Sequence, residues 1–208
     1  MTNDTASTEA NVTVHLGLGS NVGDRRANLR EAVARIEKLG VEVARESSIY
    51  ETEPVGFKDQ PWFLNQVIEL RIDHDLAFGG AVMAEMKKSA AHLWSWVLEL
   101  HKALQNIERD MGRERSVPDG PRVIDIDLLL CGELVRTETG DSTTATAGSA
   151  YLTIPHPRMH LRRFVLEPLC EIAPDAIHRV FKKTCREMMA SLDDPSIVRR
   201  YDPTRAHS

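Results

Sequence analysis

The segment Val123–Leu130 limits the possible folds of this 208-residue chain more than any other. It is apolar except for Asp125 and Asp127, which stand two residues apart inside it. Alternate side chains of a β-strand lie on the same face, so both carboxylates would point to one side while Ile126 points to the other. We therefore expect a core strand that presents a pair of acids on one face.

Two carboxylates on one strand face repel each other unless a cation lies between them. Hard oxygen ligands of this kind suit Mg²⁺ that also binds phosphate groups. The alternative is a solvent-facing strand with two ordinary acids. Because the rest of the strand is apolar, the pattern favours a metal site at Asp125 and Asp127.

Arginines lie near this strand in the sequence. Arg113 and Arg115 follow an amphipathic segment, Arg122 directly precedes the strand, and Arg162 comes later. Guanidinium groups beside a divalent cation are suited to phosphoryl transfer, which depends on charge neutralisation and positioning. A favourable interaction with a helix dipole would also explain the arginines at the helix end. The pattern G-x-x-x-x-G-K-[ST] is absent, so an ATP site here would have to use another loop.

Composition excludes several classes of protein. A hydrophobic share of 42% is too high for a wholly disordered chain, and the net charge of −5 has the wrong sign for a nucleic-acid-binding surface. No apolar run approaches the roughly 20 residues that a membrane helix needs, and the N-terminus lacks the pattern of a signal peptide. The three cysteines lack metal or redox spacing and suit a reducing compartment. We expect a cytoplasmic monomer that binds neither nucleic acid nor membrane.

Periodicity predicts one domain over residues 12–192, between a disordered tail at 1–11 and a C-terminal tail at 193–208 that is frayed from Arg199. Insertions are expected near 78–92 and 137–150. One helix would be capped by Asp24 and ended by Gly40, with Leu39 on its apolar face. The other expected helices are Leu93–Met111, Phe164–Ile172 with an interruption at Pro168, and Thr184–Leu192; the expected strands are Val12–Leu18, Val41–Tyr50, Phe63–Ile72, Val123–Leu130, Glu133–Val135 and Leu152–Pro155.

Five motifs occur in order along the chain. They are Leu18-Gly19-Ser20-Asn21; Tyr50-Glu51-Thr52-Glu53-Pro54-Val55-Gly56 with Asp59-Gln60-Pro61 and Phe63-Leu64-Asn65; Ile107-Glu108-Arg109 with Gly112-Arg113; Gly120-Pro121-Arg122-Val123-Ile124-Asp125-Ile126-Asp127; and Leu152-Thr153-Ile154-Pro155-His156-Pro157. From Val14 to Pro174 the chain resembles the 6-hydroxymethyl-7,8-dihydropterin pyrophosphokinase family of folate biosynthesis.

The resemblance implies a ferredoxin-like α+β fold, a mainly antiparallel sheet with helices packed on it. It also implies transfer of pyrophosphate from ATP to the pterin hydroxymethyl group, with release of AMP. Asp125 and Asp127 match the ligands of two Mg²⁺ ions, and Arg113 and Arg122 match mobile catalytic arginines. The matched ATP-binding positions are Gln105, Glu108, Arg115, Thr153, His156 and Arg162, and the matched pterin-binding positions are Thr52, Pro54, Val55, Phe63, Asn65 and Phe164.

Other functions stay open at this point. The paired acids alone would suit a D-x-D nucleotidyltransferase or glycosyltransferase, and a ferredoxin-like fold could be an RNA-binding module. The segment Ser116-Val117-Pro118-Asp119 stands where many family members carry a Trp or a further Arg. A homologue that binds pterin and ATP but turns over weakly is therefore a further alternative.

Overall fold

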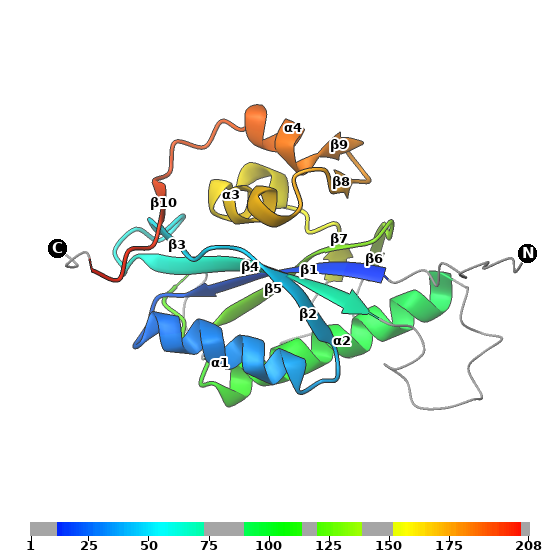
Figure 1. The fold of residues 1–208 in the computed structure, drawn as a ribbon, viewed down its shortest axis with the longest axis horizontal. Helices are drawn as coiled ribbons and strands as arrows, with labels where there is room; N and C mark the ends of the chain where they lie inside the picture. The colour runs from blue at the N-terminus through cyan, green and yellow to red at the C-terminus, as the bar shows by residue number, and fades with distance from the viewer. Residues whose placement is uncertain (1–11, 73–89, 114–119, 139–151, 205–208) are drawn as a thin grey trace, which may run out of the picture.

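The computed structural model describes residues 12–72, 90–113, 120–138 and 152–204. Its centre is an antiparallel sheet in the order β10-β3-β4-β1-β5, and β2 also pairs with β4. Helices α1 and α2 cover one face of this sheet, and α3 and α4 lie over the other (Figure 1). The bounds of these elements are β1 Val12–Ser20, α1 Arg25–Glu37, β2 Glu42–Glu46, β3 Tyr50–Thr52, β4 Phe63–Ile72, α2 Ala90–Asp110, β5 Asp125–Cys131, α3 Arg163–Ile172, α4 Cys185–Ala190 and β10 Val198–Arg200.

Strand β1 is central because both of its edges are paired. It runs antiparallel to β4 along its whole length and to β5 from Val14 to Gly19. Leu16 and Leu18 face the α1 and α2 side and join a buried apolar cluster with Ile126 and Leu128 of β5. The predicted alternation of β5 is confirmed, since Ile126 is buried between the two half-buried aspartates.

Helix α1 begins as predicted, because the Asp24 carboxylate accepts a hydrogen bond from the backbone N–H of Ala27 at 2.9 Å. Gly40 follows the helix with a φ of +84°, a conformation that glycine adopts without strain. Leu39 was expected on the buried face, and this is wrong: it is 42% exposed. The helix ends at Glu37, so Leu39 no longer follows the helical period.

The predicted strand Val41–Tyr50 is divided into β2 and β3. Between them Ser47 binds β4 through its side chain, whose hydroxyl accepts a hydrogen bond from the N–H of Val67 at 3.0 Å. The next residue, Ser48, binds Glu171 of α3 through both its backbone and its hydroxyl. The N–H of Ser47 still donates to the carbonyl of Val67 at 2.9 Å, but regular strand pairing stops over residues 47–49, so one expected strand becomes two. In contrast, the predicted strand Phe63–Ile72 has the bounds of β4.

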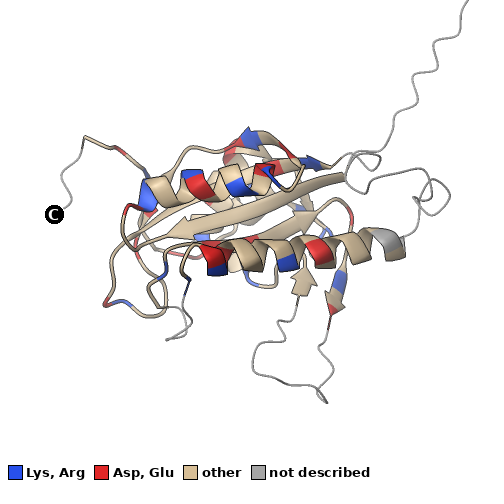
Figure 2. Cartoon of the chain, turned by 90° about the horizontal axis from the view of Figure 1, so that it is seen from below, with Lys and Arg blue, Asp and Glu red and all other residues tan. Residues whose placement is uncertain are grey.

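Helix α2 confirms the predicted amphipathic segment, with Trp94, Val97, Leu100 and Leu104 buried against the sheet. Seen from the helical side, α1 and α2 carry acidic and basic residues interspersed (Figure 2). No helix in the described part of the chain combines the length and apolarity needed to cross a bilayer. Residues 78–89 of the predicted insertion at 78–92 lie outside the described residues, and the remaining three begin α2.

The segment after β5 differs from the prediction. Gly132 turns the chain, but the next strand is β6 Arg136–Glu138 rather than Glu133–Val135, and it pairs with β7 Leu152–Ile154. This pairing places the first two residues of the predicted insertion 137–150 in a strand, and 139–151 lie outside the described residues.

Pro168 does not interrupt α3, which is continuous over Arg163–Ile172. Pro168 is the sixth of the ten helical residues, where it removes one N–H donor, and its ring is buried with Val165, Leu169 and Ile172. A two-stranded hairpin, β8 Ile177–His178 and β9 Lys183–Thr184, leads into α4. Helix α4 is shorter than expected at its end, and Thr184 is its cap, in a capping box with Glu187.

The C-terminal segment is not frayed at Arg199. Val198–Arg200 forms β10 and pairs antiparallel with β3 at the edge of the sheet. Tyr201 packs against the main apolar cluster, so the ordered domain extends past the predicted limit at 192. The predicted tail at 1–11 lies outside the described residues.

Candidate active site

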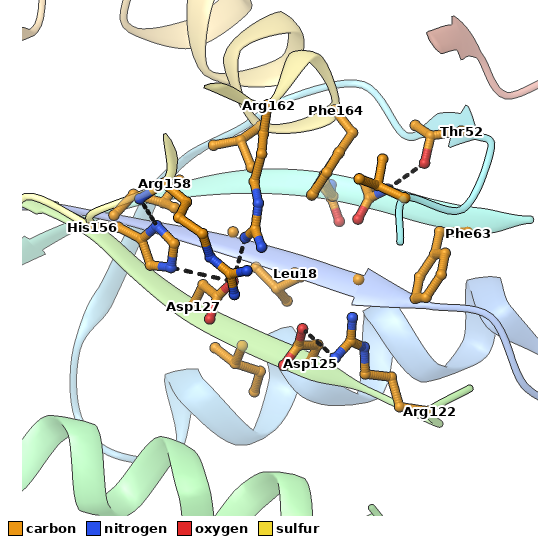
Figure 3. A pocket seen from close by; sticks show the side chains of 18 of the residues that line it. Leu18, Thr52, Phe63, Arg122, Asp125, Asp127, His156, Arg158, Arg162 and Phe164 are labelled. Carbon is orange, nitrogen blue, oxygen red and sulfur yellow. Dashed lines mark hydrogen bonds and ion pairs between the residues drawn. The ribbon is translucent and has the colours of Figure 1, made fainter. Parts of the chain in front are cut away.

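A cleft of about 1050 Å³ opens on the α3 side of the sheet, where β1, β4 and β5 meet. Asp125 and Asp127 both point into it from β5, as Figure 3 shows. The volume is at the upper end of the range for small-molecule sites, so it can hold more than one compact ligand.

Most predicted site residues line this cleft, whereas Pro54 is buried outside it and Thr153 of β7 is half-buried outside it. Arg115 lies outside the described residues. The predicted residues that line the cleft are Thr52, Val55, Phe63, Asn65, Gln105, Glu108, Arg113, Arg122, Asp125, Asp127, His156, Arg162 and Phe164.

Asp125 is paired with two arginines. Its Oδ1 lies 2.7 Å from Nη1 of Arg113, and its Oδ2 lies 3.3 Å from Nη1 of Arg122. Burial raises the pKa of Asp125, and the nearby Asp127 carboxylate raises it further, against the opposing effect of the guanidinium groups. The ionised form of Asp125 is therefore destabilised by its surroundings, and an added positive charge would stabilise it.

Glu108 connects α2 to the middle of β5. The residue is 4% exposed, and its Oε1 accepts a hydrogen bond from the backbone N–H of Ile126 at 2.7 Å. Arg113 also binds this carboxylate. Burial raises the pKa of Glu108 to about 7, although the Arg113 charge and the Ile126 N–H oppose the rise. Glu108 thus fixes the β5 backbone at Ile126, between the two aspartates, and also holds Arg113, which faces them.

Asp127 is the more open of the two acids, with 38% of its side chain exposed. Nε2 of His156 lies 4.0 Å from its Oδ2, and Nη1 of Arg162 lies 3.9 Å from the same oxygen (Figure 3). Both separations exceed that of a direct hydrogen bond, so these contacts are charge or dipole interactions across a short gap.

His156 is a neutral donor in this arrangement. Burial, followed by the charges of Arg162 and Arg158, lowers its pKa to about 4. The backbone N–H of Arg158 donates to Nδ1 at 3.2 Å. Because Nδ1 accepts a hydrogen bond, the ring hydrogen of the neutral imidazole is on Nε2, which faces Asp127.

An aromatic slot adjoins the acidic site. Phe63 at the start of β4 and Phe164 in the first turn of α3 both line it. Asn65 also lines the cleft, and its Nδ2 donates to the hydroxyl of Thr52 at 2.7 Å in a buried contact. A Cβ on Gly19 would lie 2.8 Å from Oδ1 of Asn65, so glycine gives the amide the space that it occupies.

Two arginines connect the slot with the acids. The guanidinium carbon of Arg122 lies 5.4 Å from the centre of the Phe63 ring, and that of Arg162 lies 5.4 Å from the centre of the Phe164 ring. Both distances are within the range of cation–π attraction. The site therefore combines two carboxylates, several arginines beside them and a slot lined by two aromatic rings.

Comparison with known proteins identifies the family. The model of the 7,8-dihydro-6-hydroxymethylpterin-pyrophosphokinase (HPPK) family matches residues 15–174. The chain belongs to the HPPK family. It is 39% identical over 160 residues to 2-amino-4-hydroxy-6-hydroxymethyldihydropteridine pyrophosphokinase of Bacillus subtilis, covering 76% of each chain. It is 36% identical to the protein of the same name from Methylorubrum extorquens, covering 89% of this chain and 96% of that one.

Some HPPK relatives are longer proteins. The chain is 38% identical to the mitochondrial folate synthesis bifunctional protein of Pisum sativum but spans only 26% of its length. The wild-type HPPK-DHPS of Plasmodium falciparum, solved with pteroate, shares the fold with a TM-score of 0.61 and 12% identity. That match covers 88% of this chain and 44% of the solved chain.

Several residues of the HPPK cleft were missed by the sequence prediction. Gly17 and Gly19 line it, and their spacing in β1 places them on one strand face, a pattern that could have identified them. His101 lies one helical turn before Gln105, and their side-chain nitrogens are 3.1 Å apart. Helical periodicity would have found it. Arg158 follows His156 in an irregular loop, where no local pattern indicates which side chain points inward.

Proposed function

We propose that this HPPK-family protein transfers the pyrophosphate group of ATP to the hydroxymethyl group of 6-hydroxymethyl-7,8-dihydropterin, with release of AMP, as a step of folate biosynthesis. The observation that carries this proposal is the position of Asp125 and Asp127 between an arginine border and an aromatic slot in one cleft. The proteins from Bacillus subtilis and Methylorubrum extorquens, which the chain matches over most of their length, support it by name.

The two aspartates fit a magnesium site. They offer carboxylate oxygens on one strand face, and the pKa of Asp125 is raised, so a cation would stabilise its ionised form. Among the described residues no group of three or more His, Cys, Asp or Glu is arranged to hold a metal. Such a site needs phosphate oxygens to complete it, and we propose two Mg²⁺ ions bound with ATP. Bound Mg²⁺ would neutralise phosphate charge during the transfer.

The arginines would bind the phosphate chain. Arg113 and Arg122 already converge on Asp125 at 2.7 and 3.3 Å, and within the described chain Nε of Arg122 has no hydrogen-bond partner. A buried donor without an acceptor favours an anionic ligand beside it. In the transfer the hydroxymethyl oxygen forms a bond to the β-phosphorus, and the bond from this phosphorus to the α,β-bridging oxygen breaks. Arg113 and Arg122 would stabilise the charge on these oxygens.

The nucleotide side would be formed by Gln105, Glu108, His156 and Arg162, with Arg115 and Thr153 retained as proposals from the resemblance. His156 presents an N–H at Nε2, and Arg162 presents a guanidinium beside Asp127. Both are hydrogen-bond donors at neutral pH, which suits phosphate oxygens rather than another cation.

The pterin would lie in the aromatic slot. Phe63 and Phe164 offer ring faces for a flat heteroaromatic ligand, and the buried Asn65–Thr52 pair offers polar groups at its edge. Val55 lines the cleft from the loop after β3, and Pro54 supports that loop from a buried position. Backbone groups of this loop would bind the donor and acceptor edge of the ring.

The finer architecture that we propose is ferredoxin-like. The succession β1-α1-β2-β4-α2-β5 has the strand-helix-strand-strand-helix-strand order of that fold, and its strands pair antiparallel. We also propose a cytoplasmic monomer. The three cysteines are free thiols, and burial raises the pKa of Cys131 to about 12, which suits an unreactive residue in a reducing compartment.

The test is to incubate the protein with ATP, Mg²⁺ and 6-hydroxymethyl-7,8-dihydropterin and to separate the nucleotide products. We expect AMP and the pterin diphosphate in equal amounts, and loss of at least about 99% of the rate in Asp125→Ala or Asp127→Ala. Formation of ADP, or full activity in either variant, would contradict the proposal. Binding of both substrates without turnover would instead identify a catalytically weakened homologue.

A further inference from the structure

The C-terminal strand β10 lies next to the residues that build the aromatic slot. It pairs with β3, which carries Thr52. Beyond the paired residues, the N–H of Glu53 donates to the carbonyl of Ile197 at 3.2 Å, and the N–H of Ile197 donates to the Glu53 carboxylate at 3.0 Å. At the other end the N–H of Tyr201 donates to the carbonyl of Ile49 at 2.8 Å. The strand that presents Thr52 is thus held along its outer edge by residues near the end of the chain.

Arg199 of β10 contacts Glu51 and Trp62, the residues that directly precede Thr52 and Phe63 in the chain. Its Nη2 and Nε lie 2.7 and 3.2 Å from Oε2 of Glu51, and its guanidinium lies 4.9 Å from the centre of the Trp62 ring. Arg25 binds the same two residues, donating to Oε1 of Glu51 at 3.1 Å and to the carbonyl of Trp62 at 2.7 Å. Glu51 is 6% exposed. The two arginines and Glu51 therefore fix the backbone immediately before Phe63.

Arg200, the next residue, contacts the far end of α3, the helix whose first turn carries Phe164. Its Nη2 lies 3.3 Å from Oε1 of Glu171, near the end of α3. Glu171 also accepts hydrogen bonds from Ser48 and from the hydroxyl of Tyr50 in β3 at 3.0 Å. Because α3 is one continuous helix, these contacts restrain the element that carries Phe164 in its first turn.

We propose that β10 is a positioning element for the aromatic slot, with Arg199 as its main positioning residue and Arg200 as a weaker one. This inference rests on the proposed function, because it assumes that the slot binds pterin. The family match ends at residue 174, so these arginines lie outside the matched region. Arg200 is 70% exposed at its side chain, whereas Arg199 binds a buried carboxylate and stacks on an aromatic ring, so Arg199 contributes more.

The test compares Arg199→Ala with Arg186→Ala, which removes an arginine from an exposed pair with Asp175. For each full-length variant, titration calorimetry measures the Kd of 6-hydroxymethylpterin and, separately, the Kd of a non-hydrolysable ATP analogue with Mg²⁺. In Arg199→Ala the pterin Kd should rise about tenfold, because Thr52 and Phe63 are held less firmly in the geometry that binds the ligand. The Kd of the ATP analogue should change by less than about twofold, as should both constants in Arg186→Ala.

Conservative variants separate positioning from general stability. Arg199→Lys keeps the charge but loses the planar fork on Glu51 and the stacking on Trp62, so it should recover only part of the pterin affinity. Arg200→Lys keeps the charge beside Glu171, at a side chain that is 70% exposed, and should behave like the wild type.

The outcomes distinguish two failures. If wild-type protein binds pterin and Arg199→Ala binds it equally well, the positioning role is wrong. An equal rise in both Kd values also overturns it, because that result indicates a general loss of structure. If wild-type protein does not bind pterin even when it is saturated with the ATP analogue and Mg²⁺, the proposed function is wrong, and the role of β10 falls with it.

Discussion

The backbone N–H of Ile126 donates a hydrogen bond of 2.7 Å to the side chain of Glu108. Ile126 is the residue between the two aspartates, and Glu108 belongs to a helix on the opposite face of the sheet. This contact fixes the position of the β5 backbone at the point where the carboxylates of Asp125 and Asp127 enter the cleft. The helix that lies behind the sheet therefore helps to set the geometry of the acidic pair in front of it.

Removal of Glu108 should weaken both the fold and the site. Glu108→Ala leaves the buried N–H of Ile126 without its acceptor, at a cost of about 1–3 kcal/mol in the free energy of unfolding. Glu108→Gln keeps an acceptor oxygen and should lose less. Urea denaturation measures both, with Glu99→Ala as the control, because Glu99 forms an exposed pair with Lys102. Equal stability of Glu108→Ala and Glu99→Ala would show that the contact contributes nothing.

Gly19 should be intolerant of a side chain for a steric reason. An added Cβ would lie 2.8 Å from Oδ1 of Asn65, a distance that real Cβ contacts essentially never show. Gly19→Ala should displace the Asn65 amide and raise the KM for pterin about tenfold. The matched variant is Gly17→Ala, whose Cβ would meet the flexible Leu129 side chain at 3.4 Å and should have a much smaller effect. Similar kinetics in the two variants would contradict this account.

Local pattern predicted the elements whose apolar residues repeat regularly. Phe63–Ile72 and the apolar face of α2 were identified because a strand or helix period continues through each. The acidic pair was found for the same reason, since alternation along β5 fixes both carboxylates on one face. The cap at Asp24 needed only a side-chain oxygen and an N–H three residues away.

Contacts between distant segments could not be predicted from local pattern. Strand β10 has only three residues, and what orders it is pairing with β3, about 150 residues earlier in the chain. At the break between the two strands of 41–50, Ser48 binds Glu171 of α3, more than 120 residues later in the chain. The contact of Glu108 with Ile126 likewise needs the folded sheet to bring α2 against β5.

Phe164 should contribute more to pterin binding than to ATP binding. Its ring lines the slot, and the charge of Arg162 lies on it at 5.4 Å. Phe164→Ala should raise the KM for pterin by about 10- to 100-fold through loss of aromatic contact area, with a smaller change in the KM for ATP. Phe164→Tyr keeps the ring face and serves as the control. Steady-state kinetics with each substrate varied in turn gives both constants, and a larger change for ATP would oppose the assignment.

Acid sensitivity should arise in part at His178, away from the cleft. Its side chain stacks on Phe181 with ring centres 4.5 Å apart and is buried, with its residue 3% exposed. Burial, followed by the charge of His160, lowers the pKa of His178 below its ordinary value of 6.5. The unfolded chain therefore binds the proton more readily than the folded one, so this residue makes stability fall as the pH drops below about 6.5.

Substitution tests this pH dependence. His178→Gln removes the titrating ring, so its free energy of unfolding should decrease less steeply than that of the wild type between about pH 6.5 and pH 5. The comparison of slopes matters, because loss of stacking on Phe181 lowers stability at every pH. Urea denaturation at intervals across this range gives the two curves. Parallel curves would mean that His178 does not take up its proton preferentially in the unfolded chain.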